Sequence, residues 1–338
     1  MEKSKIQLSE KSVIKLLDAW SFPGALTLQP TNQGTVNTTF IVETQAGKFV
    51  LKLYNKDTTT TQIQYEHSLL AHLQKLDLSF VVPTPVPTAL GETQVLFNQN
   101  NLLLRVALLP FISGEPALRN HLYHTHAVGR ALGELHHALA SFDSDGKLSQ
   151  LPAWGNLRHI HPLVTDPFEI PQLLELPLTQ QQRITKTLTE VIEVAPKLYN
   201  TLPVQTTHAD FLCPNVLLTE NRVVGILDFE FATNDLRLMD YVAALDHFSR
   251  MPSKEAPRWE FIKAFSTGYA KHVSLSPLEL EALTLVWRLQ QASCIVYWTG
   301  WLREGKVTYQ SVLDGVTKML LLEDWFEENT AKLLSYVV

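Results

Sequence analysis

The sequence predicts an α+β protein with two lobes, a β-rich N-terminal lobe and a mostly helical C-terminal lobe. The chain has 338 residues, and at about 150 residues per domain this length suits two domains or one domain with two lobes. Short β-type runs bounded by turn signals dominate the first 110 residues, whereas longer runs with helical periodicity follow. We therefore divide the chain into lobes 1–110 and 111–338, with a hinge at 110–114.

The composition favours a small-molecule partner. Hydrophobic residues make up 45% and charged residues 18% of the chain, which excludes disorder, collagen and coiled coil. The formal net charge is −6, and no run rich in Lys and Arg provides a nucleic-acid or anionic-membrane surface. The most apolar stretch, 102–112, is interrupted by Arg105 and is about half the ~20 residues of a spanning helix. We expect no nucleic-acid partner and no membrane segment.

The cysteines and the N-terminus indicate a cytoplasmic protein. Cys213 and Cys294 are far apart in the sequence and have no metal-ligand spacing, so neither a disulfide framework nor a zinc site is expected. Residues 1–20 alternate charged and apolar residues at helical spacing and lack the uninterrupted apolar stretch of a signal peptide.

The N-terminal lobe is expected to contain two hairpins and one helix. Glycine in the turn 44–47 supports the first hairpin, and an Asn-rich turn supports the second. The helix places Glu66 on the same face as its leucines, and an unpaired buried carboxylate is costly, so Glu66 requires a cation. The expected elements are strands 36–43 and 48–54, helix 62–76, a proline-rich connector 82–87, and strands 94–97 and 101–109.

The C-terminal lobe is expected to be helical with one β-type interruption. Its expected helices are 125–141, 179–198, 239–248, 257–273, 276–303 and 309–338, with a long loop over 143–171. Short apolar runs at 204–207, 216–218 and 223–228 are expected to form strands. Polar residues follow these strands, which is where a fold commonly presents reactive side chains.

The polar residues of this interruption suit phosphoryl transfer. That reaction needs a base to orient a hydroxyl, metal ions to neutralise the triphosphate and a cation to hold the phosphates. Asp210 lies in a loop after a strand, and Asn215 follows five residues later. Asp228 is expected to end the next apolar strand, and Mg²⁺ favours a few carboxylate or amide oxygens together with phosphate and water.

The motif His208-x-Asp210-x4-Asn215, followed by Leu-Asp228-Phe-Glu, resembles the catalytic and metal loops of the aminoglycoside phosphotransferase-like kinases. That resemblance implies a protein-kinase-like fold. Lys52 in Phe-Val-Leu-Lys-Leu-Tyr resembles the strand lysine of such kinases, and Glu66 resembles its helix partner.

The resemblance implies ATP and Mg²⁺ as cofactors and a small-molecule hydroxyl as acceptor. Residues 1–110 would form the nucleotide-binding lobe, and residues 111–338 the catalytic and acceptor-binding lobe. The loop 32–37 has one glycine where protein kinases have three. The implied site residues are Asp210 as catalytic base with His208 in the same motif, Lys52, Glu66 and Gly34 for the nucleotide, and Asn215 and Asp228 for the metal.

Within the family, the run 226–240 and Asn-Thr-Thr-Phe at 37–40 most resemble the homoserine kinases, which favours a homoserine-like amino alcohol. Choline, ethanolamine and aminoglycoside kinases, and a nucleotide-binding regulatory pseudokinase, stay as alternatives. Tyr297, Trp298 and Trp301 are interpreted as core rather than as a cage for a quaternary ammonium. The candidate cations for an acceptor carboxylate are Arg237, Arg250 and Arg288.

Two further predictions concern supporting residues. Asp240 resembles the aspartate that braces the catalytic segment in this family, although a carboxylate in the first turn of a helix is nearly as good an interpretation. His136 and His137 are expected to be ordinary helix residues.

Overall fold

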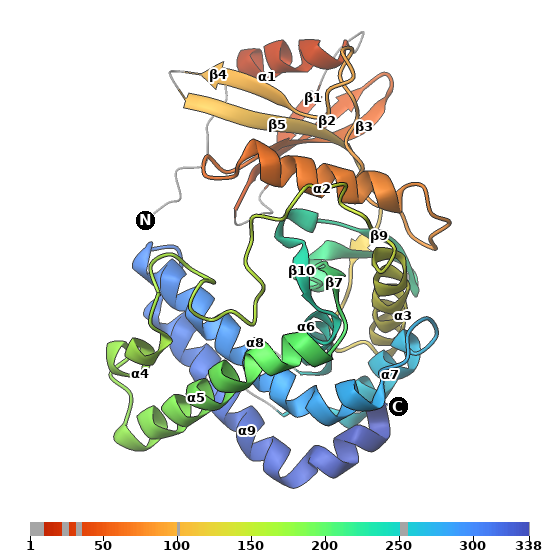
Figure 1. Ribbon diagram of the computed structural model, residues 1–338. Helices are drawn as coiled ribbons and strands as arrows, with labels where there is room; N and C mark the ends of the chain where they lie inside the picture. The colour runs from red at the N-terminus through yellow and green to blue at the C-terminus, as the bar shows by residue number, and fades with distance from the viewer. Residues whose placement is uncertain (1–9, 22–26, 32–35, 100–101, 251–255, 338) are drawn as a thin grey trace. The chain divides into compact units, whose positions relative to one another are not determined.

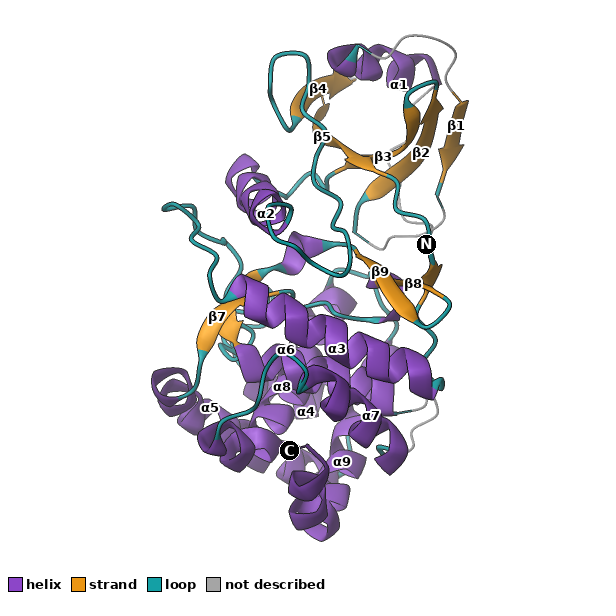
Figure 2. Ribbon diagram, turned by 90° about the vertical axis from the view of Figure 1, so that its right-hand side faces the viewer, coloured by secondary structure: helices purple, strands orange, loops and turns teal. Residues whose placement is uncertain are grey.

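The chain divides into two compact units in the computed structural model, which describes residues 10–21, 27–31, 36–99, 102–250 and 256–337. The first unit comprises Met1–Ser113, Asp143–Leu148 and Gly225–Glu230, and the second comprises Gly114–Phe142, Ser149–Val224 and Phe231–Val338. The first is built on a sheet and the second is mostly helical (Figures 1 and 2). The predicted α+β class is therefore confirmed. Among the described residues, every helix is too short or too polar to cross a membrane.

A five-stranded antiparallel sheet in the order β1-β2-β3-β5-β4 forms the first unit. Both predicted hairpins are confirmed, because β2 pairs with β3 and β4 pairs with β5. The elements are α1 (Glu10–Leu17), a 3-10 turn η1 (Asp18–Trp20), β1 (Thr27–Pro30), β2 (Thr38–Thr44), β3 (Gly47–Leu53), α2 (Thr60–Leu73), β4 (Val95–Gln99) and β5 (Leu102–Pro110).

The two faces of β3 pack against different helices. Leu51 and Leu53 belong to the core cluster that contains the apolar residues of α1. Val50 packs instead against the cluster that contains Ile63 of α2. Because side chains alternate along a strand, Lys52 shares the face of Val50. The strand thus directs Lys52 toward the helix that contains Glu66.

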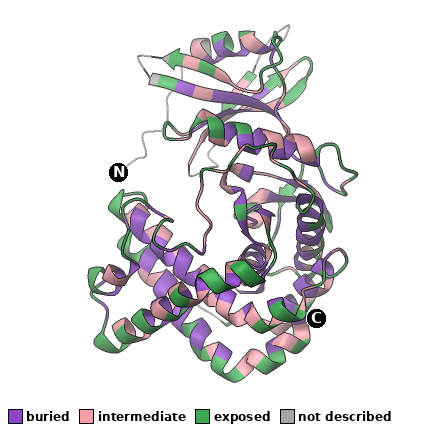
Figure 3. Ribbon diagram, in the orientation of Figure 1, coloured by how far each residue is buried: buried purple, intermediate pink, exposed green. Residues whose placement is uncertain are grey.

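The described part of the second unit contains seven helices and two small sheets, and each helix predicted from the sequence is present. Many positions of α3 and α8 are buried (Figure 3). The elements are β6 (Glu115–Pro116), α3 (Leu122–Leu139), η2 (Pro167–Glu169), α4 (Ile170–Leu173), α5 (Leu178–Thr201), β7 (Val204–Thr207), η3 (Cys213–Asn215), β8 (Val216–Thr219), β9 (Arg222–Ile226), η4 (Phe229–Phe231), β10 (Thr233–Leu236), α6 (Arg237–Ser249), α7 (Trp259–Tyr269), α8 (Pro277–Arg303) and α9 (Tyr309–Val337).

Glycines allow α3 and α7 to approach closely. A Cβ atom at Gly129 would lie 2.1 Å from the main-chain oxygen of Phe265, and one at Gly268 would lie 2.2 Å from that of His126. Neither distance is possible for a real Cβ, so any larger residue would push the two backbones apart. This tight contact with α7 fixes the position of α3, the helix that contains His136.

The structure differs from the sequence predictions at four strands, of which β1 and β6 were not expected. β9 ends at Ile226 rather than at Asp228, because Asp228 adopts a left-handed backbone with φ of +63°, which a strand cannot continue. The strand β10 was not expected, since its sequence Thr-Asn-Asp-Leu is polar. Pairing with β7 over four residues stabilises it.

Candidate active site

Lys52 lies at the centre of a buried charge cluster in the first unit. Its Nζ atom is 3.1 Å from Oε1 of Glu66 and 3.2 Å from Oδ1 of Asp228. A third carboxylate, that of Glu230, has its Oε2 atom 3.7 Å from the same ammonium. Lys52 and Glu66 are each 5% exposed. The cation that Glu66 requires is therefore Lys52.

The electrostatics of this cluster leave an excess of negative charge. Burial tends to lower the pKa of Lys52, but the charges of Glu66, Asp228 and Glu230 outweigh it and raise that pKa well above its ordinary value. Burial raises the pKa of Glu230 to about 7, against the opposing charge of Lys52. Asn37 donates a hydrogen bond from Nδ2 to Glu230. Three carboxylates around one ammonium give the cluster a negative formal charge.

Asp210 is held by its own loop in the second unit. Its backbone N–H donates to Nδ1 of the buried His208 over 3.2 Å. Nδ2 of Asn215 donates both to the main-chain oxygen of Asp210, at 2.9 Å, and to its Oδ2 atom, at 2.7 Å. The side-chain oxygen of Asn215 has no hydrogen-bond donor in the described part of the chain. That oxygen has the chemistry of a magnesium ligand.

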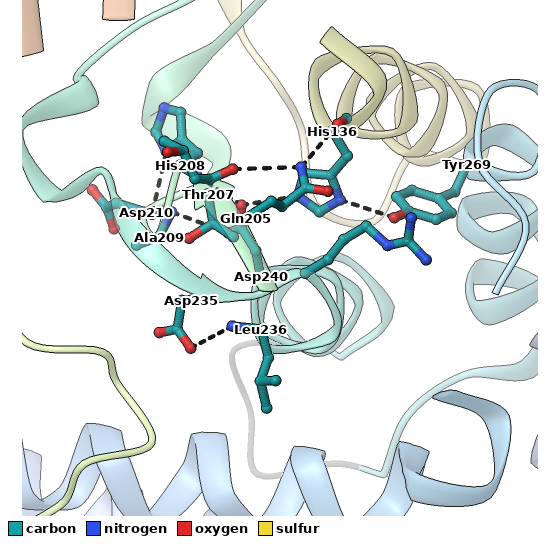
Figure 4. A network of polar contacts seen from close by, with 12 residues as sticks. His136, Gln205, Thr207, His208, Ala209, Asp210, Asp235, Leu236, Asp240 and Tyr269 are labelled. Carbon is teal, nitrogen blue, oxygen red and sulfur yellow. Dashed lines mark hydrogen bonds and ion pairs between the residues drawn. The ribbon is translucent and has the colours of Figure 1, made fainter. Parts of the chain in front are cut away.

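Asp240, in the first turn of α6, accepts hydrogen bonds from the loop that contains Asp210 (Figure 4). Its Oδ2 atom accepts the N–H of His208 at 2.9 Å, and its Oδ1 atom accepts the N–H of Ala209 at 3.2 Å. Nε2 of His136 lies 3.1 Å from the same Oδ2 atom, and Nδ1 of that ring lies 2.8 Å from the Tyr269 hydroxyl. Asp240 thus lies in the first turn of a helix, as one interpretation expected, and also holds the backbone of His208 and Ala209, as the bracing interpretation expected.

These contacts favour the ionised form of the Asp240 carboxylate. Burial tends to raise the pKa of Asp240, but the hydrogen bond and charge of His136 and the backbone N–H of His208 outweigh burial and lower that pKa below its ordinary value. Ala209, which lies between His208 and Asp210 in the sequence, has a φ of +63°. Alanine adopts this left-handed conformation less readily than glycine.

His136 has a part in this network that was not predicted from the sequence. The prediction of an ordinary helix residue holds for the exposed His137, but His136 is 1% exposed and belongs to the Asp240 network. Its spacing contained the signal: it lies four residues after Leu132 and three before Leu139, on the apolar face of α3. A histidine on such a face needs polar partners, as a buried polar group does.

The structure brings the predicted site residues together in two groups, one in each unit. Lys52, Glu66 and Asp228 meet in the first unit, whereas Asp210, His208 and Asn215 meet in the second. Gly34 lies outside the described residues. The described residues contain no group of three or more His, Cys, Asp or Glu side chains arranged to hold a metal.

The three arginines considered for an acceptor carboxylate are all engaged in ion pairs. Nη2 of Arg237 lies 2.8 Å and 2.6 Å from the two carboxylate oxygens of the buried Glu279. Arg250 pairs with Asp246 at 3.1 Å. Arg288 lies 3.5 Å from Glu190.

The aromatic residues of α8 form a partly exposed cluster rather than a sealed core. The ring centre of Tyr297 lies 4.8 Å from that of Trp301 and 5.2 Å from that of Trp154. Phe231, directly after the Asp-Phe-Glu run, contacts the same tyrosine at 6.3 Å. All four residues are half-buried.

Comparison with known proteins identifies relatives of this chain. Residues 27–273 match the model of the phosphotransferase enzyme family. The homoserine kinase of Bartonella henselae is 28% identical over 278 residues, which cover 80% of each chain.

Two solved kinase structures have the same fold as this chain. The microcompartment-associated aminopropanol kinase matches with a TM-score of 0.75 at 18% identity, covering 96% of this chain and 100% of that one. The amicoumacin kinase in complex with AMP-PNP and Ca²⁺ matches with a TM-score of 0.68 at 16% identity, covering 94% of both.

Proposed function

Because this chain belongs to the phosphotransferase enzyme family, in which it is a small-molecule kinase acting on a hydroxyl group, we propose that it phosphorylates a homoserine-like amino alcohol with ATP and Mg²⁺. One observation carries the phosphoryl-transfer chemistry: the buried Lys52 ammonium contacts Glu66 and Asp228 at the same time. A kinase needs such a lysine to hold phosphates and such a carboxylate to hold metal. The choice of acceptor rests on the similarity to homoserine kinases.

The proposed site divides the work of phosphoryl transfer among its residues. Lys52 binds the phosphates, and Glu66 keeps its ammonium in place. Asp228 of the first unit and Asn215 of the second each have a side-chain oxygen of the kind that Mg²⁺ binds, and Mg²⁺ would neutralise the charge of the triphosphate. We propose residues 1–110 as the nucleotide-binding part and residues 111–338 as the catalytic and acceptor-binding part.

Asp210 is the proposed base. The acceptor oxygen forms a bond to the γ-phosphorus, the bond from that phosphorus to the bridging oxygen breaks, and ADP leaves. The hydroxyl proton passes to the Asp210 carboxylate. His208, which is buried and bonded to the Asp210 backbone, positions the loop without touching substrate.

The free thiols of Cys213 and Cys294 support a reducing, cytoplasmic location in this proposal.

The test is ADP release with Mg²⁺ and ATP against L-homoserine, choline, ethanolamine and an aminoglycoside. We expect turnover with L-homoserine and a loss of about a hundredfold or more in D210N. The matched control is D77N, the same substitution in an exposed loop. If D210N retains the wild-type rate, Asp210 is not the base.

A cationic acceptor without a carboxylate is the second candidate, because the partly exposed rings around Tyr297 could bind an ammonium group. Turnover of choline instead of L-homoserine would favour it. Thermal stabilisation by ATP without any turnover would instead indicate a nucleotide-binding regulator.

A further inference from the structure

A cluster of cations surrounds one buried carboxylate in the second unit. Asp246 of α6 is 3% exposed, and its Oδ1 atom accepts hydrogen bonds from Arg250 at 3.1 Å and from Nε1 of Trp287 at 3.3 Å. Lys318 of α9 pairs with its Oδ2 atom. Burial tends to raise the pKa of Asp246, but Lys318 and Arg250 outweigh burial and lower it, so this carboxylate stays charged.

Arg119 adds a third cation to this cluster. Its Nε atom donates to the main-chain oxygen of His247 at 2.8 Å, and its Nη2 atom donates to that of Arg250 at 2.9 Å. Within the described residues it has no carboxylate partner. Arg119, Arg250 and Lys318 therefore bring three positive charges together with the single negative charge of Asp246.

The cluster is attached to the loop of the proposed base. Nε2 of His247 accepts the backbone N–H of Cys213, three residues after Asp210, at 3.2 Å. Burial, together with the charges of Arg119 and Lys318, lowers the pKa of His247 to about 3, so its ring is neutral and adds no charge.

Charges of both the cluster and the proposed base affect Cys294 of α8. The pKa of its thiol is raised to about 12, chiefly by burial; the charges of Asp246 and Asp210 also raise this pKa, whereas the charge of Lys318 lowers it. The carboxylate of Asp210 and the ammonium of Lys318 thus act on the same thiol. The hydrogen bonds of His247 to Cys213 and to Arg119 join the loop of the proposed base to the cation cluster.

We propose that Lys318 and Arg119 bind the carboxylate of the acceptor, an inference that rests on the proposed amino-alcohol kinase function. The Lys318 side chain is 30% exposed, whereas that of Arg250 is 1% exposed. Arg250 and Asp246 therefore hold Lys318 in place, and Lys318 keeps a face open to a ligand. A carboxylate would form charge-assisted hydrogen bonds with both cations.

The test compares two acceptors that differ only in this carboxylate. L-Homoserine becomes 3-aminopropan-1-ol when its carboxylate is replaced by hydrogen. The quantity measured is the ratio of kcat/KM for homoserine to that for aminopropanol. We expect K318Q to lower this ratio about tenfold or more, because one charge-assisted hydrogen bond is lost. K318R keeps the charge and is expected to retain most of the ratio.

The control is K332Q on the same helix, because Lys332 is exposed and its ammonium lies over the rings of Trp259 and Tyr336. Its ratio is expected to match that of the wild type. Should K318Q fail to fold, R119Q provides the same comparison from the other cation.

The outcomes separate this inference from the proposed function. A wild-type enzyme that phosphorylates homoserine, with the ratio unchanged in K318Q and R119Q, leaves the function standing and overturns the carboxylate subsite. An equal loss for both acceptors also overturns it, because it would show a structural role alone. Turnover of choline or aminopropanol without homoserine rejects the inference together with the homoserine proposal, and leaves a kinase.

Discussion

The substitution D240N should destabilise the protein strongly although it preserves the shape of the side chain. Asp240 is 2% exposed, and its two oxygens accept N–H groups from different residues: Oδ2 from His208 and Oδ1 from Ala209. An asparagine has only one acceptor oxygen. In either orientation of the amide, one backbone N–H faces an NH₂ group and loses its acceptor.

The expected loss follows from these contacts. A buried donor left without a partner costs about 1–3 kcal/mol. Removing one charge of a buried, hydrogen-bonded set such as Asp240 and His136 costs roughly 3–5 kcal/mol in total. We therefore expect D240N to lose about 3–5 kcal/mol of unfolding free energy at pH 7.

Urea unfolding at several pH values tests this expectation. The pKa of Asp240 is lowered in the folded protein, so its stabilising effect is present above the unfolded value of about 3.9 and is lost as the pH falls through the lower folded value. The difference between wild type and D240N should therefore shrink in acid. A D240N protein within about 0.5 kcal/mol of wild type at pH 7 would refute the bracing role.

Three further substitutions test other parts of the second unit. G268A should lower the unfolding free energy by about 2 kcal/mol or more, because its Cβ would lie 2.2 Å from the main-chain oxygen of His126; an unchanged melting temperature would contradict the close helix packing. A209G should raise the unfolding free energy by about 0.5 kcal/mol, because relief of the left-handed strain exceeds the added chain entropy; a loss in urea unfolding would count against this strain. Burial raises the pKa of Asp235 to about 6, although Tyr199 donates to it. Because this folded value exceeds the unfolded one, Asp235 should reduce stability as the pH rises from about 4 to 6, and D235N should remove that slope from a series of melting curves.

Much of the fold could be predicted because its signals are local. The β2–β3 and β4–β5 hairpins follow from alternating residues and turn chemistry, and the helices follow from apolar periodicity. β10 could not be predicted, because pairing with β7 outweighs its polar composition. The left-handed Asp228 that ends the strand early is likewise set by surroundings rather than by neighbours in the sequence.

The site residues fall into the same two classes. A cation partner for Glu66 could be predicted, because this carboxylate interrupts an apolar helix face. Lys52 is that partner. Pairs of polar side chains that are far apart in the sequence could not be predicted from local patterns. Lys318 and Asp246 are 72 residues apart, and His136 and Asp240 are 104 residues apart. Arg250 was a candidate for acceptor binding, but its 1% exposed side chain supports Asp246 instead.

The segment Gly225–Glu230 groups with the first unit although more than a hundred residues of the second precede it in the sequence. Its Ile226 donates a backbone hydrogen bond to Val81, and Gly225 forms a bridge with the same residue. During synthesis the first unit therefore lacks this segment, and with it Asp228, until the ribosome has released about 230 residues. A fragment cut after Ser113 would leave Lys52 and Glu66 without the Asp228 carboxylate. Expression of the first unit alone would thus require the 225–230 segment to be supplied as a peptide or joined by a linker.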